Sequence, residues 1–336
     1  MGCIHQIVVM TFTKQITCLL KEAGFSGIAN IKSLAGGKNN QVFCIEADGK
    51  QFLLKSYFWH PADRRERLKS EFLFSSFLWK KGIRNIPCPL AKDSEHQLGL
   101  YDFVHGRKFS CDDVTESAVQ ESLNFFLAIN HHREDAEAKT LPEASEVCFS
   151  LQEHLQLIEH RLDRFKEIKE EKAIDMQARD FVFHKLVPAW EKIRRDILKA
   201  GEIQSEERCL SPSDFGFHNA LLAPEGTIYF HDFEYAGWDD PSRMICDFFC
   251  QPEFPVSLSF FDYFSKEVFG FLKNPMGLKK TRLLLPAYQI KWCCIMLNEF
   301  LSEGNDRRKF AHKEENTRVK ADQQLTKAKI YFEKYL

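Results

Sequence analysis

Residues 211–219 read Ser-Pro-Ser-Asp-Phe-Gly-Phe-His-Asn, and residues 232–234 read Asp-Phe-Glu. An Asp and an Asn five positions apart, followed by a second Asp after a short apolar strand, match the spacing with which kinase-like enzymes hold a catalytic base and two magnesium ligands. Phosphoryl transfer asks a protein mainly for positioning and charge neutralisation. The stretch therefore predicts a phosphoryl-transfer site.

Asp214 is the candidate catalytic base, because a carboxylate at the start of the loop can orient or deprotonate an acceptor hydroxyl. Asn219 can turn back toward the same cavity and offer a carbonyl oxygen to Mg²⁺, which prefers hard oxygen ligands. Asp and Asn are also common turn residues, so on this evidence alone a loop without catalytic importance stays open.

A hairpin is expected to return the chain to this loop. Leu221-Leu222 and residues 227–231 have the apolar character of strands, and Gly226 is the turn residue between them. The second strand would deliver Asp232 as a metal ligand. Glu234 would share the face of Asp232 if that strand persists, and we rank it as the weaker candidate ligand.

A second constellation lies upstream, in the order that a kinase needs. Gly36-Gly37 is expected to form a small turn whose backbone N–H groups can approach phosphate oxygens without Cβ obstruction. Asp48-Gly49 then predicts a hairpin between residues 42–45 and 51–55. Lys55 ends the second strand, placed to reach the α- and β-phosphates of a nucleotide. Taken singly, a glycine pair or a solvated strand-end lysine is common in proteins that bind no nucleotide.

Residues 64–79 have helical character, and Glu71 lies in the apolar part of this segment beside Phe72. In the kinase arrangement a helical Glu pairs with the strand Lys, so we expect an ion pair between Glu71 and Lys55. Glu66 is a rival in the same segment, and a solvent-exposed glutamate is the alternative interpretation.

Together these motifs resemble the aminoglycoside phosphotransferase and choline kinase-like family of small-molecule kinases, whose fold is similar to that of protein kinases. The resemblance spans roughly residues 30 to 300 and includes an interlobe linker, Leu-Tyr-Asp-Phe-Val-His-Gly, at residues 100–106. It implies a two-lobed α+β fold. Residues 1–105 would form an ATP-binding lobe with an antiparallel sheet and one helix, and residues 106–336 a larger, mostly helical catalytic and acceptor-binding lobe.

The resemblance also implies functional groups for this chain. ATP and Mg²⁺ would be the cofactors, and backbone groups at Tyr101, Phe103 and Val104 would bind the adenine. The chain departs from the family at Pro212, because the family usually has His two residues before the base. This departure keeps a nucleotide-binding pseudoenzyme with a regulatory or scaffold role as an alternative.

The acceptor is expected to be the hydroxyl of a small molecule, with a sugar or sugar-like metabolite slightly ahead of an aminoglycoside or a choline or ethanolamine type of amino-alcohol. A cationic acceptor would need clustered carboxylates or an aromatic cage. A protein kinase is disfavoured because no Asp-Phe-Gly or Ala-Pro-Glu segment follows the catalytic loop.

Composition agrees with these expectations. The chain has 336 residues, of which 44% are hydrophobic and 31 are Phe, enough to bury a large core in two lobes. A formal net charge of -2 argues against a general nucleic-acid binder. No apolar run approaches the roughly 20 residues that cross a bilayer, so we expect no membrane partner and a cytoplasmic location.

Four further local expectations follow from the pattern. Helices are predicted over residues 12–24, 151–165 and 181–198, with Asp112 or Asp113 capping the first helix after residue 111. Asp247 is expected to brace a loop as a hydrogen-bond acceptor. Lys291-Trp292 and residues 298–300 are expected to belong to the core and surface of an ordinary late helix, with a place in the acceptor pocket as the alternative.

Overall fold

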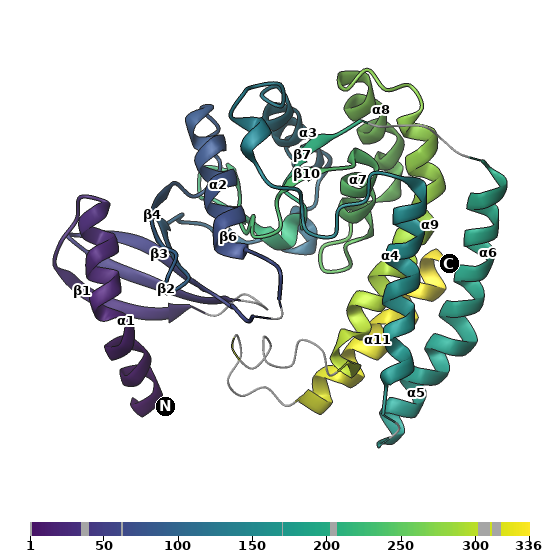
Figure 1. Ribbon diagram of the computed structural model, residues 1–336, viewed down its shortest axis with the longest axis horizontal. Coiled ribbons are helices and arrows are strands. Elements are labelled where there is room, and N and C mark those ends of the chain that lie inside the picture. The colour runs from purple at the N-terminus through teal and green to yellow at the C-terminus, as the bar shows by residue number, and fades with distance from the viewer. Residues whose placement is uncertain are drawn as a thin grey trace.

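The computed structural model describes residues 2–34, 40–61, 63–169, 171–201, 207–301, 310 and 317–336. Its N-terminal part is a five-stranded antiparallel sheet in the order β1-β2-β3-β5-β4, with two helices against it (Figure 1). The strands are β1 (Ile28–Leu34), β2 (Asn40–Ala47), β3 (Lys50–Tyr57), β4 (Pro89–Asp93) and β5 (Leu98–Asp102), and the helices are α1 (Gly2–Glu22) and α2 (Arg67–Lys80).

The turn between β2 and β3 forms at the predicted place. Asp48 and Gly49 have φ angles of 49° and 72°, as a tight two-residue hairpin requires, and Ala47 pairs with Lys50 at its base. Alternate residues of these strands point inward, where α1 covers them. The resulting small core includes Ile16, Leu19, Leu20, Phe43, Ile45, Phe52, Leu54, Leu98 and Leu100.

The remainder is mostly helical (Figure 1). Its helices are α3 (Glu116–Asn130), α4 (Leu151–Asp163), α5 (Ala173–Phe181), α6 (Val187–Lys199), α7 (Pro241–Cys250), α8 (Phe261–Phe271), α9 (Gly277–Met296) and α11 (Thr317–Tyr335). Short strands carry the loops between them: β6 (Arg107–Lys108), β8 (Ala220–Leu222) and β9 (Ile228–Phe230) form one antiparallel sheet, and β7 (Cys209–Ser211) pairs with β10 (Gly237–Asp239).

A cluster of phenylalanine rings holds the predicted catalytic stretch in place. Phe215 stacks on Phe125 and Phe248 at centroid distances of 5.9 and 5.2 Å, and Phe230 lies 4.4 Å from Phe125. Phe233 is buried in the same core. Because rings from 215 to 248 pack on α3 and on one another, the two polar segments between them are fixed to a rigid base.

Three local expectations needed correction. The first helix runs from Gly2 to Glu22, so it begins before the predicted residue 12 and ends before Gly24, whose φ is 86°. The cap of α3 is Thr115, whose hydroxyl accepts from the Ala118 N–H, whereas Asp113 instead binds Ser110 and Arg107.

The predicted helix over residues 181–198 is interrupted by a π turn at Val182–Leu186, before α6 begins at Val187. Pro188, the second residue of α6, has no N–H to bond four residues back, which accounts for the changed register. Among the described residues, no helix is both long enough and apolar enough to cross a membrane.

Candidate active site

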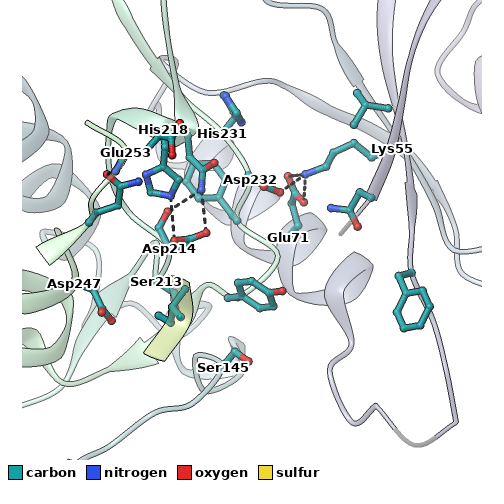
Figure 2. Close-up of a pocket in the computed structure, with 18 of the residues that line it drawn as sticks. Lys55, Glu71, Ser145, Ser213, Asp214, His218, His231, Asp232, Asp247 and Glu253 are labelled. Atoms are coloured by element: carbon teal, nitrogen blue, oxygen red, sulfur yellow. Dashed lines mark hydrogen bonds and ion pairs between the residues drawn. The ribbon is translucent and has the colours of Figure 1, made fainter. Parts of the chain in front are cut away.

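A cavity of about 1260 Å³ lies between the N-terminal sheet and the helical part. Half-buried apolar side chains line it from both sides, namely Leu34, Val42 and Leu53 from the sheet and Val104 and Leu221 from beyond β5. Such an apolar slot suits a flat heterocycle, and polar groups converge beside it (Figure 2).

The expected ion pair forms at the back of this cavity. Lys55 Nζ lies 2.9 Å from Glu71 Oε1 and 2.6 Å from Glu71 Oε2, and both side chains are buried. The Tyr57 hydroxyl donates to Glu71 Oε2 at 2.8 Å and lies 2.9 Å from the Tyr101 hydroxyl. The rival Glu66 pairs on the surface with Lys69, so the helical glutamate facing the strand lysine is Glu71.

Asp232 joins this pair from the other side of the cavity. Its Oδ1 accepts from Lys55 Nζ at 2.6 Å, and its φ of 69° turns the chain sharply after β9. Burial lowers the pKa of Lys55, but the carboxylates of Asp232 and Glu71 more than offset this and hold that pKa above its ordinary value. The lysine therefore stays cationic where an anion would bind.

The predicted catalytic stretch forms a tight loop around Asp214 (Figure 2). Asn219 Nδ2 donates to the Asp214 carbonyl at 2.9 Å and lies 3.4 Å from Asp214 Oδ2. His218 Nε2 lies 3.0 Å from Asp214 Oδ1. A Cβ on Gly216 would come within 2.9 Å of His218 Nδ1, so the glycine permits the imidazole to fold back over the loop.

His218 is a site residue that sequence reasoning missed. The sequence does hold a signal for it, because His218 lies four residues after Asp214 and a short helical turn brings residues four apart together. The turn is a 3₁₀ segment at Phe217–Asn219. An imidazole thus contacts the candidate base although Pro212 replaces the histidine expected two residues before it.

The strand ends at Phe230, so the strand alternation that was expected to place Glu234 and Asp232 on one face does not extend to them. Its buried carboxylate instead accepts from Asn40 Nδ2 at 2.8 Å and lies 3.8 Å from Arg67 Nε. Burial, with the nearby charge of Asp232, raises the pKa of Glu234 to about 7. The geometric reason for ranking Glu234 as a metal ligand was therefore wrong.

The residues expected to bind adenine all line the cavity, in different ways. Tyr101 lies inside β5, paired with Leu53, and its ring is buried behind the lysine and glutamate pair. Phe103 and Val104 follow the strand in an irregular segment. Gly36 and Gly37 lie outside the described residues.

The donor set fits a hard metal ion. With its amide nitrogen bonded to Asp214, Asn219 has its amide oxygen left for a cation, and Asp232 carries a partly exposed carboxylate into the same cavity. Within the described ranges no group of three or more His, Cys, Asp or Glu side chains could hold a metal ion, so an ion here would need further ligands from elsewhere.

No family model matches the sequence, and no curated protein matches it. Solved structures do match. A choline/ethanolamine kinase family protein from Mesorhizobium loti has a TM-score of 0.58 at 16% identity, covering 96% of this chain and 95% of its own. Spectinomycin phosphotransferase, solved with ADP and spectinomycin, has a TM-score of 0.60 at 13% identity over 95% and 97%. The chain has the aminoglycoside phosphotransferase and choline kinase fold.

A choline kinase from Streptococcus pneumoniae, similar at a TM-score of 0.57 and 13% identity, covers 99% of both chains. The predicted fold class is thereby confirmed, including the two-lobed arrangement. In this kinase-like fold the cleft between the lobes is the cavity that holds Lys55, Asp214 and Asp232.

The far half of the cleft is built from the helical lobe. Asp247 accepts from Lys291 Nζ at 2.8 and 2.9 Å and from Trp292 Nε1 at 3.0 Å. It is a hydrogen-bond acceptor as expected, but it joins α7 to α9 instead of bracing a loop. Lys291, Trp292, Asn298 and Glu299 all line the cavity. Lys291 and Trp292 are buried, and Trp292 belongs to the core of the helical lobe, as expected. The same end of α9 also borders the cleft, so core packing and a place beside the acceptor pocket do not exclude each other.

Proposed function

We propose that the protein is an ATP- and Mg²⁺-dependent phosphotransferase that moves the γ-phosphoryl group of ATP to a hydroxyl of a small molecule. The observation that carries this proposal is the double contact of Lys55 Nζ, 2.6 Å from both Glu71 Oε2 and Asp232 Oδ1, in the cleft that Asp214 lines. A kinase needs this set to order nucleotide phosphates and to receive a hydroxyl proton.

The nucleotide is proposed to bind between the lobes, which we divide near residue 105. The adenine would lie between Val42 and Leu221, bonded by backbone groups of Phe103 and Val104. Lys55, fixed by Glu71, would reach the phosphates. The apolar side chains on two sides of the cavity suit the adenine ring, and the charged Lys55 suits the phosphates.

Asn219 and Asp232 are proposed to hold Mg²⁺, with phosphate oxygens completing its ligands. When bound, the ion would neutralise charge on the transferring phosphate. Glu234 is left out of this set, because Asn40 and Arg67 already engage its carboxylate.

Asp214 is proposed to orient the acceptor hydroxyl and take its proton. Its side chain is 38% exposed toward the cleft, while His218 at 3.0 Å and Asn219 at 3.4 Å restrict where its carboxylate can point. The His218 contact places an imidazole against the base despite Pro212, which supports an active enzyme over a pseudoenzyme. Preorganisation of this kind reduces the reorganisation needed during transfer.

The test is Mg²⁺-dependent ADP release from ATP with sugars, amino sugars, aminoglycosides, choline, ethanolamine and a mixed peptide as acceptors. We expect turnover with one small-molecule class, sugars first, and none with the peptide. Nucleotide-dependent thermal stabilisation without turnover on any acceptor would favour the pseudoenzyme.

A further inference from the structure

The far side of the cleft carries an arginine-rich wall. We define the acceptor wall as the six charged residues Glu146, Arg161, Arg164, Arg243, Asp247 and Lys291, all of which line the cavity. They come from α4, α7, α9 and the segments beside α4. Figure 2 shows Asp247 on the opposite side of Asp214 from Lys55, so this wall faces the position of an acceptor rather than of the nucleotide.

The carboxylates of the acceptor wall are already engaged. Glu146 pairs with Arg161, and Asp247 pairs with Lys291 at 2.8 Å. Burial would raise the pKa of Glu146, but the charges of Arg161, Lys291 and Arg243 hold it well below its ordinary value. A cationic acceptor would compete with these lysine and arginine side chains for each carboxylate.

The cations of the wall outnumber its carboxylates by four to two. Behind the wall, Arg243 Nη1 lies 2.5 Å from Asp239, a carboxylate with no exposed surface whose pKa burial raises to about 6. With Asp239 included, Arg161, Lys291 and Arg243 each have one carboxylate as a partner. At the rim, Lys327 pairs with Glu253 and Lys320 with Glu299, so that part is balanced.

Two guanidinium groups of the wall also have donors to offer. Arg161 and Arg243 are only 8% and 4% exposed, and the Nε of each has no hydrogen-bond partner among the described residues, although Arg243 Nε lies 3.8 Å from Asp247 Oδ2. A buried donor without an acceptor is costly. A ligand with anionic oxygens would supply both charge and acceptors to such a pair.

We infer that the acceptor carries an anionic group, a carboxylate or a phosphate, which Arg161 and Arg243 bind while Asp214 faces the hydroxyl. This inference rests on the proposed function and specifies its substrate class. It separates this chain from acceptors that present only positive charge, because every wall carboxylate is already paired.

The test compares four sugars that share one pyranose ring and differ in charge: glucose, glucosamine, glucuronate and glucose 6-phosphate. Thermal stabilisation is measured with ADP and Mg²⁺ present, and ADP release with ATP. The variants are Arg161→Gln, Arg161→Lys as a charge-preserving check on folding, and Arg282→Gln as a control, since Arg282 forms an exposed pair with Asp262 away from the cleft.

We expect an anionic sugar to stabilise the protein more than glucose and glucosamine do. Arg161→Gln should weaken its binding at least about tenfold without changing the KM for ATP, while Arg282→Gln keeps wild-type binding. Stabilisation by glucosamine or glucose alone, or anionic binding indifferent to Arg161→Gln, would overturn the inference. Asp214-dependent turnover of a neutral or cationic acceptor would overturn the inference of an anionic acceptor and leave the kinase proposal intact. Binding of an anionic sugar without any turnover would count against the kinase proposal and not against the anion site.

Discussion

Lys55 and Asp232 are 177 positions apart in the chain, yet Lys55 Nζ lies 2.6 Å from Asp232 Oδ1. Lys55 belongs to the N-terminal sheet, and Asp232 follows the β8–β9 hairpin of the helical lobe. This contact crosses the cleft, and with Glu71 it sets one cation against two carboxylates. When a nucleotide and a metal ion bind, we expect Asp232 to turn from Lys55 to the metal and Lys55 to contact the phosphates.

Lys55→Met should raise the KM for ATP at least about tenfold and destabilise the fold. The substitution leaves the buried Glu71 carboxylate without its lysine partner. Breaking a buried ion pair in this way lowers the free energy of unfolding by about 3–5 kcal/mol. Steady-state kinetics and urea denaturation measure the two effects. Lys69→Met is the matched control, because its pair with Glu66 is exposed and contributes at most about 1 kcal/mol. Equal effects of both substitutions would contradict the account.

Asp232→Asn should raise the Mg²⁺ concentration for half-maximal nucleotide binding roughly tenfold or more, because a neutral amide binds a hard divalent cation less well than a carboxylate. The measurement is fluorescence titration of an ATP analogue at several Mg²⁺ concentrations. An unchanged Mg²⁺ dependence would remove Asp232 from the metal site, and Glu234→Gln, outside the proposed ligand set, should keep the wild-type dependence.

His218→Leu should lower kcat roughly tenfold to a hundredfold with little change in the KM for ATP, because it frees the Asp214 carboxylate to rotate away from the acceptor. His218→Gln keeps a donor and should recover part of the rate. The control is His184→Leu, since His184 makes the same type of contact with Asp180 four residues before it, at 2.8 Å on the surface. A fall in stability with no change in kcat would assign His218 a structural role only.

Glu234 should make stability depend on pH. Its pKa is raised from 4.5 to about 7 in the folded protein, so its contribution to stability is present below pH 4.5 and is lost as the pH rises through about 7. Glu234→Gln mimics the neutral form. The unfolding free energy of the variant minus that of wild type should therefore increase as the pH is raised from 5 to 8, by a few kcal/mol at most. Chemical denaturation at both values checks this, with exposed Glu66→Gln as control. A difference that stays constant with pH would contradict the buried-carboxyl explanation.

The elements that position the site could be predicted from local patterns. Asp48-Gly49 encodes its own turn, and the choice of Glu71 over Glu66 followed from the apolar neighbours of Glu71. The Asp214 to Asn219 spacing brings both residues together because a short 3₁₀ turn separates them. These signals are local or use fixed spacing, so one sequence is sufficient to detect them.

Long-range features could not be predicted in the same way. Glu234 faces Asn40, 194 positions away, and nothing near residue 234 indicates that the strand would already have ended. Likewise, Arg161 and Arg243 meet in the acceptor wall only because of how α4 and α7 are placed in the fold, which sequence separations do not reveal. The roles of the site residues stay predictions, although the fold brings Lys55, Glu71, Asp214 and Asp232 to one cleft.

The most direct test of phosphoryl transfer is ADP release from ATP and Mg²⁺ with the acceptor panel, comparing wild type and Asp214→Asn. Because the substitution removes only the proton-accepting charge, kcat should fall roughly 10²- to 10⁴-fold while ATP binding persists. Acceptor-dependent turnover in wild type that is lost in the variant is the predicted result. Turnover that Asp214→Asn leaves unchanged would contradict the proposed mechanism.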